Sequence, residues 1–137
     1  MTPLLLDTCA AIWLAEDEPI AAAAAEALDA VARAGTAVFI SPMSGWEIGL
    51  LVAKRRVTIS MHPEAWFSRL LAVAGVALAE LGVGTLIASS FLPGDPPRDP
   101  VDRILAATAR AGGYRLVTRD RALLAYADAG HVAALAC

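Results

Sequence analysis

The sequence predicts an α/β fold in three layers, with a central parallel sheet covered by helices on both faces. Short apolar runs that fit buried strands alternate along the chain with longer segments of good helix formers. The first strand is expected at Leu4–Leu6, an unbroken apolar run that ends abruptly at Asp7. Because 137 residues fit one hydrophobic core, residues 1–137 are predicted to form a single domain.

Helix ends in the first half of the chain are marked by capping residues. Thr8 and Ser41 are candidate N-caps, Pro42 fits the first helical position, and Gly35 fits the position just past a helix. With the apolar runs, these signals predict helices Thr8–Glu16, Ala21–Ala34, Pro42–Lys54 and Pro63–Ala74, and strands Ala37–Ile40 and Val76–Leu81.

The second half of the chain continues the alternation. Pro93–Pro97 is too rich in Pro and Gly for regular structure, and Gly112 followed by Gly113 stops a helix. The same reasoning predicts helices Thr85–Leu92, Asp99–Ala111 and Arg121–Ala127, a strand Arg115–Thr118, and a weak final strand Val132–Leu135.

The composition limits the classes of function. Hydrophobic residues make up 58% of the chain against 18% charged, which excludes disorder and favours extensive burial, with apolar surface left for a partner. Four aromatic and aliphatic side chains on early helices are expected to contribute to that surface, although a core position is the commoner fate of a single Trp: Ile12, Trp13, Trp66 and Phe67. The net charge of −3 argues against a general basic surface for nucleic acid, because neutralising phosphates requires clustered Lys and Arg. A small acidic site with a locally basic rim is still compatible with this balance.

One stretch, Leu70–Leu92, is apolar enough to raise the question of a membrane span. Glu80 is its only charged residue, and the stretch is long enough to cross a bilayer. However, a carboxylate near the centre of a span is costly, and Gly75 and Gly82 divide the stretch into shorter pieces. We therefore expect no membrane span.

The cysteines and the first residues indicate the compartment. Cys9 and Cys137 are the two cysteines, too few for the disulfide framework of a small secreted protein. The first residues carry Asp7 instead of a basic signal region. A cytoplasmic protein is expected.

Four carboxylates share a pattern along the chain. Asp7 and Asp120 follow predicted strands, and Asp102 lies in the first turn of a helix. Capping is an equally good explanation for each of these, because Asp99–Asp102 also fits an N-cap, a Pro and an acid. Glu47 lacks that explanation, since it lies mid-helix in a segment that the sequence predicts to be buried nearly all round.

A cluster of these acids would need a cation. In open α/β sheets the ligand crevice lies outside the carboxyl ends of the strands, where Asp7 and Asp120 are expected. Acids gathered there repel one another, and hard cations that prefer oxygen ligands are the best explanation. The sequence therefore predicts a Mg²⁺ or Mn²⁺ site.

Four segments in this order carry a resemblance to a known family. They are Leu4–Thr8, the "S-x-W-E" motif of Ser44–Glu47, the "D-P-x-D-R" motif of Asp99–Arg103, and the "L-V-T-x-D" motif of Leu116–Asp120. The chain resembles PIN-domain ribonucleases, and specifically the VapC-type toxins of bacterial toxin–antitoxin pairs. The likeness covers nearly the whole chain.

The resemblance implies a fold, a site and partners. It implies the strand order 3-2-1-4-5, which brings Asp7 beside Asp120. It implies that the metal-site acids are Asp7, Glu47, Asp102 and Asp120, with Asp99 auxiliary. It further implies a metal-dependent endoribonuclease, an RNA substrate, a cognate antitoxin and a homodimer. The sequence departs from many relatives at Cys9, where they carry a His, so substrate contacts of that His do not carry over.

Hydroxyls and basic residues near the acids are candidate auxiliary groups. Thr8, Ser44 and Thr118 could hold a water or a carboxylate, although packing or capping is the alternative for each. Arg103 and Arg119 flank the acids and could neutralise them or contact phosphate, and for Arg103 an internal ion pair is the first expectation. Phosphate contacts are a further possibility for Lys54, Arg55, Arg56 and Arg119, while charge compensation at a helix end is the commoner role for such a basic triplet.

Three other classes of protein compete with the nuclease interpretation. A phospho-receiver domain requires a Lys after its last strand, whereas the one Lys here is Lys54 on an early helix. A haloacid-dehalogenase-like phosphatase requires an Asp at the position of Cys9. A catalytically inactive PIN-like binding module stays open as an alternative.

Overall fold

Five short parallel strands form the centre of the computed structural model, which describes residues 1–137. The strands are β1 (Leu4–Leu6), β2 (Val38–Ile40), β3 (Val76–Leu78), β4 (Arg115–Thr118) and β5 (Ala133–Ala136). Their order is β3-β2-β1-β4-β5, so the predicted α/β fold and strand order are confirmed. Leu5 of β1 pairs with Phe39 on one side and with Leu116 on the other.

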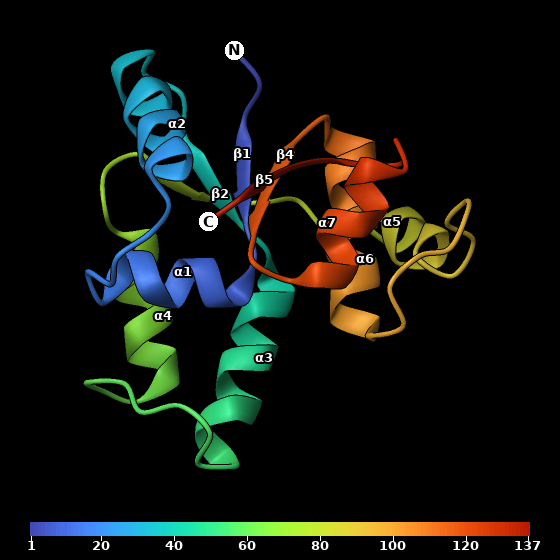
Figure 1. Ribbon diagram of the computed structural model, residues 1–137. Helices are drawn as coiled ribbons and strands as arrows, with labels where there is room; N and C mark the ends of the chain where they lie inside the picture. Colours follow the sequence, from blue (N-terminus) through green and yellow to red (C-terminus); the bar gives the residue numbers. More distant parts are fainter.

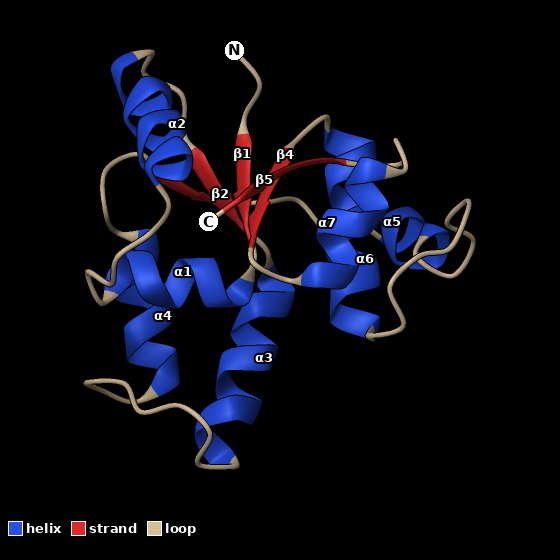
Figure 2. Ribbon diagram, viewed as in Figure 1, coloured by secondary structure: helices blue, strands red, loops and turns tan.

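Seven helices surround the sheet. They are α1 (Thr8–Ala15), α2 (Ala22–Arg33), α3 (Pro42–Ala53), α4 (Pro63–Leu71), α5 (Val83–Ala88), α6 (Pro100–Gly112) and α7 (Arg121–Asp128). Figure 1 and Figure 2 show α1, α2 and α4 on one side of the sheet and α5, α6 and α7 on the other. Helix α3 begins at the carboxyl end of β2 and extends away beyond the strands (Figure 1).

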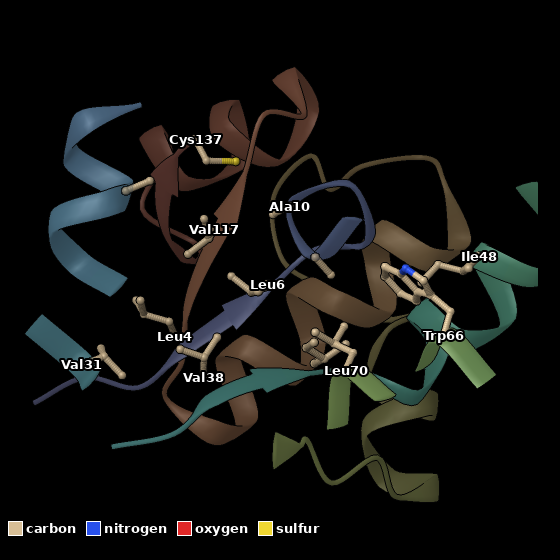
Figure 3. Packing of buried hydrophobic residues seen from close by; sticks show 13 residues of the cluster. Leu4, Leu6, Ala10, Val31, Val38, Ile48, Trp66, Leu70, Val117 and Cys137 are labelled. Atoms are coloured by element: carbon tan, nitrogen blue, oxygen red, sulfur yellow. The ribbon is translucent and has the colours of Figure 1, made fainter. Parts of the chain in front are cut away.

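The two faces of the sheet build two separate core clusters. Leu4 and Leu6 point to the face covered by α1, α2 and α4, where Trp66 and Ile48 also pack (Figure 3). Leu5 points the opposite way, into the cluster with Leu105, Leu123 and Tyr126 of α6 and α7. Side chains of a strand alternate between faces, so a continuous apolar run serves both cores.

Several predicted boundaries change in the structure. Thr8 is not the N-cap of α1: Asp7 takes that position, and Thr8 is the first helical residue. Helix α5 starts at Val83 and ends at Ala88, so it lies earlier than the predicted Thr85–Leu92. Ser41 caps α3 as predicted, with its Oγ accepting from the Met43 N–H at 3.1 Å.

The apolar stretch around Glu80 is divided as the glycines predict. Helix α4 ends at Leu71, and β3 and α5 follow as separate short elements. No helix is long and apolar enough to cross a membrane.

Two expectations about burial are wrong. Helix α3 is not buried nearly all round: only Ser44 and Ile48 are buried, and Trp46 is 59% exposed. Trp66, by contrast, was expected to contribute to an apolar surface and is only 5% exposed. Both errors arise because α3 projects past the sheet while α4 packs against it, which composition alone does not reveal.

We predict that Leu5→Ala lowers the free energy of unfolding by about 3 kcal/mol, because a fully buried Leu leaves a cavity between two packed layers. Leu78→Ala, at a 47% exposed position on the edge strand β3, should cost less than about 1 kcal/mol. Urea denaturation followed by circular dichroism measures both. Equal losses in the two variants would contradict the assignment of β1 to the centre of the core.

Candidate active site

Asp7 is a buried carboxylate at the carboxyl end of the central strand. It is 7% exposed. Its Oδ1 accepts a hydrogen bond from the Ala10 N–H at 2.7 Å, and its Oδ2 accepts one from Thr118 Oγ1 at 2.5 Å. Burial raises the pKa of Asp7 above its ordinary value; these two hydrogen bonds oppose the rise, and the charges of Glu47 and Asp120 add to it. The Asp7 charge is therefore held by hydrogen bonds alone.

Three acids of the predicted site are helix N-caps. Asp7 caps α1, Asp99 caps α6 through the Asp102 N–H at 3.1 Å, and Asp120 caps α7 through the Leu123 N–H at 2.9 Å. The capping interpretation is thus correct for each. Capping also fixes where these carboxylates lie, because α1 and α7 begin directly after the parallel strands β1 and β4. The carboxyl ends of those strands meet at one edge of the sheet.

Asp102 lies within electrostatic reach of the other acids. It is half-buried in the first turn of α6. Burial raises the pKa of Asp102 to about 7, and the charges of Asp120, Asp99, Glu47 and Asp7 add to the rise in that order. No Lys or Arg side chain donates a hydrogen bond to any of these carboxylates. The predicted site acids therefore share one region of uncompensated negative charge.

The donor set suits a hard divalent cation, but the acids are not preassembled around one. No three Asp, Glu, His or Cys side chains lie close enough together to hold a metal ion. Asp7 is fixed by two hydrogen bonds, whereas the Glu47 and Asp102 carboxylates accept none. Oxygen-only donors match Mg²⁺ or Mn²⁺, and mutual repulsion keeps uncompensated carboxylates apart. The chemistry of these residues fits such an ion.

The three predicted hydroxyls play different parts. Thr118 joins two acids: its Oγ1 donates to Asp7 and accepts from the Asp120 N–H at 2.9 Å. Thr8 Oγ1 instead donates to Ser44 Oγ at 3.0 Å, a buried bond that ties α1 to α3. Thr8 and Ser44 thus set the relative position of the helices that carry Asp7 and Glu47. The role of Thr118 was not distinguishable from the other two in the sequence.

The basic residues lie in three different surroundings, and only the ion pair expected for Arg103 is contradicted. Arg103 forms no ion pair; its Nη1 donates to the Ser89 carbonyl oxygen at 3.4 Å. Arg119 lies over the Trp13 ring at 3.8 Å and donates to the Pro19 carbonyl oxygen at 2.8 Å, so it braces the loop between α1 and α2. Lys54–Arg56 are exposed at the outer end of α3, about two helical turns beyond Glu47.

Cys9 lies close enough to the acids for their charges to act on its thiol. It is exposed on the first turn of α1. The residue as a whole is exposed, but its sulfur is partly buried. This partial burial and the charges of Asp7, Glu47 and Asp102 raise the pKa of the Cys9 thiol to about 11. The thiol is therefore neutral at physiological pH and adds no charge to the acids.

The fold and the placement of these acids define an α/β protein of the PIN-like class. The PIN domain family model matches residues 4–129, and the chain belongs to the PIN domain family. It is 32% identical over 125 residues to Ribonuclease VapC22 of Mycobacterium tuberculosis, covering 90% of this chain and 91% of that protein. The predicted resemblance to VapC-type proteins is confirmed.

Solved structures share the fold. One is the complex VapBC2 from Rickettsia felis bound to a DNA fragment from their promoter, with a TM-score of 0.69, 13% identity and 98% coverage of both chains. Another is FitAcB from Neisseria gonorrhoeae, with a TM-score of 0.57, 20% identity and 96% coverage of both chains. The likeness to these structures is one of architecture.

We predict that Asp102→Asn raises the melting temperature of the metal-free protein at pH 8 but not at pH 4. The pKa of Asp102 is raised in the folded state from its ordinary value of 3.8 to about 7, so the folded protein binds this proton more tightly than the unfolded chain does. The stability that the bound proton contributes is therefore lost as the pH rises from about 4 to about 7. Because the group is partly exposed, we expect about 1 kcal/mol, or roughly 3 °C. Differential scanning calorimetry measures the shift.

The matched control is Asp29→Asn at an exposed position of α2, which should leave the melting temperature unchanged at both pH 4 and pH 8. A gain at pH 4 equal to that at pH 8 would contradict the repulsion among the acids.

Proposed function

We propose that this protein is a metal-dependent endoribonuclease and the toxin of a toxin–antitoxin pair. One observation carries the proposal: Asp7, Glu47, Asp102 and Asp120 form a region of uncompensated charge at the carboxyl end of the sheet in a PIN-domain chain. Identity of 32% to a ribonuclease supports RNA as the substrate. Asp99 supports the site as the cap that orients the first turn of α6.

The four carboxylates would hold Mg²⁺ or Mn²⁺. When bound, a divalent ion lowers the pKa of water for in-line attack on phosphorus and neutralises charge on the leaving oxygen. Thr118 holds the Asp7 carboxylate in one orientation, and the Thr8–Ser44 bond keeps α3, and with it Glu47, beside α1. In this mechanism water adds to phosphorus and the 3′ oxygen leaves, which yields a 5′-phosphate and a 3′-hydroxyl.

Two alternatives are less well supported. A catalytically inactive PIN-like binding module would have no need for this gathering of acids, in which the charged forms of Asp7 and Asp102 cost stability without an ion. A phospho-receiver-like domain would require a Lys near the acids, and Lys54 lies at the far end of α3. The nuclease accounts for more of the site.

A groove between α1 and α4 suits the antitoxin. A cavity of about 260 Å³ lies there, lined by apolar side chains with Glu16 and Arg69 at its rim; the apolar members are Ala15, Met61, Trp66, Leu70 and Val73. Trp66 Nε1 donates to Glu16 Oε1 at 3.1 Å, which keeps the groove wall in place. An antitoxin segment seated in this groove could extend an Arg or Lys towards the acids, because a cation neutralises them as a metal does.

A second apolar surface suits a homodimer. It consists of exposed side chains on α5 and the turn that follows it: Val83, Leu86, Ile87 and Phe91. Phe91 is 81% exposed, which is unusual for a large aromatic residue in a monomer. The four lie within nine residues of one another, so a second copy of the chain could cover them together.

The test of the proposed function is a pair of charge-removing substitutions. Asp7→Asn and Glu47→Gln should each lower RNA cleavage by at least about a hundredfold, because each removes a ligand charge with little change of volume. The fold should persist, since Asn also caps helices well. Cleavage of a labelled RNA measures activity, and the melting temperature reports folding.

Glu64→Gln, at an exposed position of α4, is the matched control and should cleave at the wild-type rate. A parallel purification from cells that lack the protein shows whether a contaminating nuclease is present. Full activity of either site variant, with no cleavage by that mock preparation, would remove the assignment of the acids.

For the homodimer, we expect Ile87→Asp combined with Phe91→Asp to produce a monomer, because two charges cannot be buried unpaired in an apolar interface. Val73→Asp, exposed on the opposite side of the sheet, should stay dimeric. Light scattering measures the mass of each. A wild-type monomer at tens of micromolar, a concentration about tenfold above a micromolar dissociation constant, would contradict the dimer.

A further inference from the structure

A polar hollow lies on α6 next to the acids, on the side that faces α5. Its volume is about 370 Å³, and six residues line it: Ser89, Ser90, Arg98, Pro100, Arg103 and Ile104. Two guanidinium groups and two serines contribute the polar lining, and no carboxylate does. We refer to it as the arginine pocket.

The arginine pocket and the acids occupy neighbouring faces of one helical turn. Pro100, Arg103 and Ile104 are spaced i, i+3, i+4, so they share one face of α6. Asp102 precedes Arg103 and lies about 100° around the same turn, because an α-helix has 3.6 residues per turn. A ligand in the pocket is therefore adjacent to whatever occupies the acidic region.

The two arginines lack anionic partners within the protein. Arg103 donates one hydrogen bond, to the Ser89 carbonyl oxygen at 3.4 Å, and Arg98 is exposed and donates none. The Ser89 hydroxyl is already used, since it donates to the Leu86 carbonyl oxygen at 2.6 Å. Two like charges facing one hollow repel each other, and most of their N–H donors bond no protein group. An anion would relieve the repulsion and accept charge-assisted hydrogen bonds from these donors.

The shape of the donors indicates which anion. A guanidinium presents a planar fork of N–H groups that matches the oxygens of phosphate. The pocket also lies at the N-terminal end of α6, whose helix dipole favours negative charge there. A tetrahedral phosphate between Arg98 and Arg103, with the Ser90 hydroxyl as a third donor, satisfies these groups together.

We propose that the arginine pocket binds a backbone phosphate of the RNA strand, adjacent to the phosphate that the acids cleave. This rests on the proposed function. The chain has a net charge of −3, so an RNA needs a local positive site to approach the acids at all. The arginine pocket supplies this positive charge on the face of α6 next to Asp102. A backbone phosphate bound there would position the neighbouring phosphate of the RNA at the acids.

The experiment measures RNA binding without cleavage. A fluorescent single-stranded RNA is titrated with wild-type protein in EDTA, and its integrity is checked by gel. Arg98→Ala and Arg103→Ala should each weaken binding about fivefold and reduce the slope of log K against log salt by about 0.7, the value for one lost phosphate contact on a single strand. Arg103→Lys should retain part of the affinity, because it keeps the charge without the fork.

The matched control is Arg33→Ala, an exposed arginine at the end of α2 on the other side of the sheet. It removes the same charge and should bind RNA as the wild type does. If Arg103→Ala fails to fold, Arg98→Ala and Arg103→Lys carry the test. An affinity and salt slope of Arg98→Ala equal to those of Arg33→Ala would overturn the proposal.

A parallel titration with inorganic phosphate separates RNA from a free anion. If phosphate stabilises the wild type and not Arg98→Ala, while both proteins bind RNA equally, the pocket is a free-anion site and the proposal is wrong. Wild-type cleavage of RNA with added Mg²⁺ is scored alongside. If the wild type cleaves RNA and Arg98→Ala binds RNA as tightly as the wild type does, the pocket proposal is wrong and the proposed function stands. If the wild type neither binds nor cleaves RNA, the proposed function is wrong as well.

Discussion

The buried Asp7 carboxylate is the constraint on which the site depends. A charge this far from water requires compensation, and the chain supplies it with hydrogen bonds from Thr118 and from the Ala10 N–H instead of a cation. The first of these bonds exists only because β1 and β4 are neighbours in the sheet. The strand order therefore determines how the Asp7 charge is stabilised. The negative charge that no Lys or Arg compensates determines which ligands the site can bind.

Helix capping and the acidic site are two consequences of one arrangement. Asp7, Asp99 and Asp120 each accept a backbone N–H at the start of a helix, an interaction worth about 1 kcal/mol. Because two of these helices start where adjacent parallel strands end, the caps also gather the carboxylates. The stability gained from capping offsets part of the repulsion that gathering them costs. The capping explanation is thus correct, and it does not compete with the proposed metal site, because the caps themselves gather the acids.

The sequence predicts the layers, the strands and, apart from Thr8, the capping residues well, because alternation and end signals are local properties. Strand order followed from the four motifs shared with a family. Burial was harder to predict: Met43–Val52 is apolar enough for a core helix, but α3 projects past the sheet and leaves Trp46 exposed. Arg103 bonds Ser89, and Arg119 lies over Trp13. These partners are distant in the sequence, and no local pattern predicts the contacts.

The most direct test of the account is RNA cleavage with mapping of the new 5′ ends, using protein freed of any antitoxin. If the acids act through a bound hard cation, cleavage requires Mg²⁺ or Mn²⁺, stops in EDTA, returns when the metal is restored, and leaves a 5′-phosphate. Cleavage that continues in excess chelator, or that leaves a 5′-hydroxyl, would contradict it and indicate a general acid–base ribonuclease.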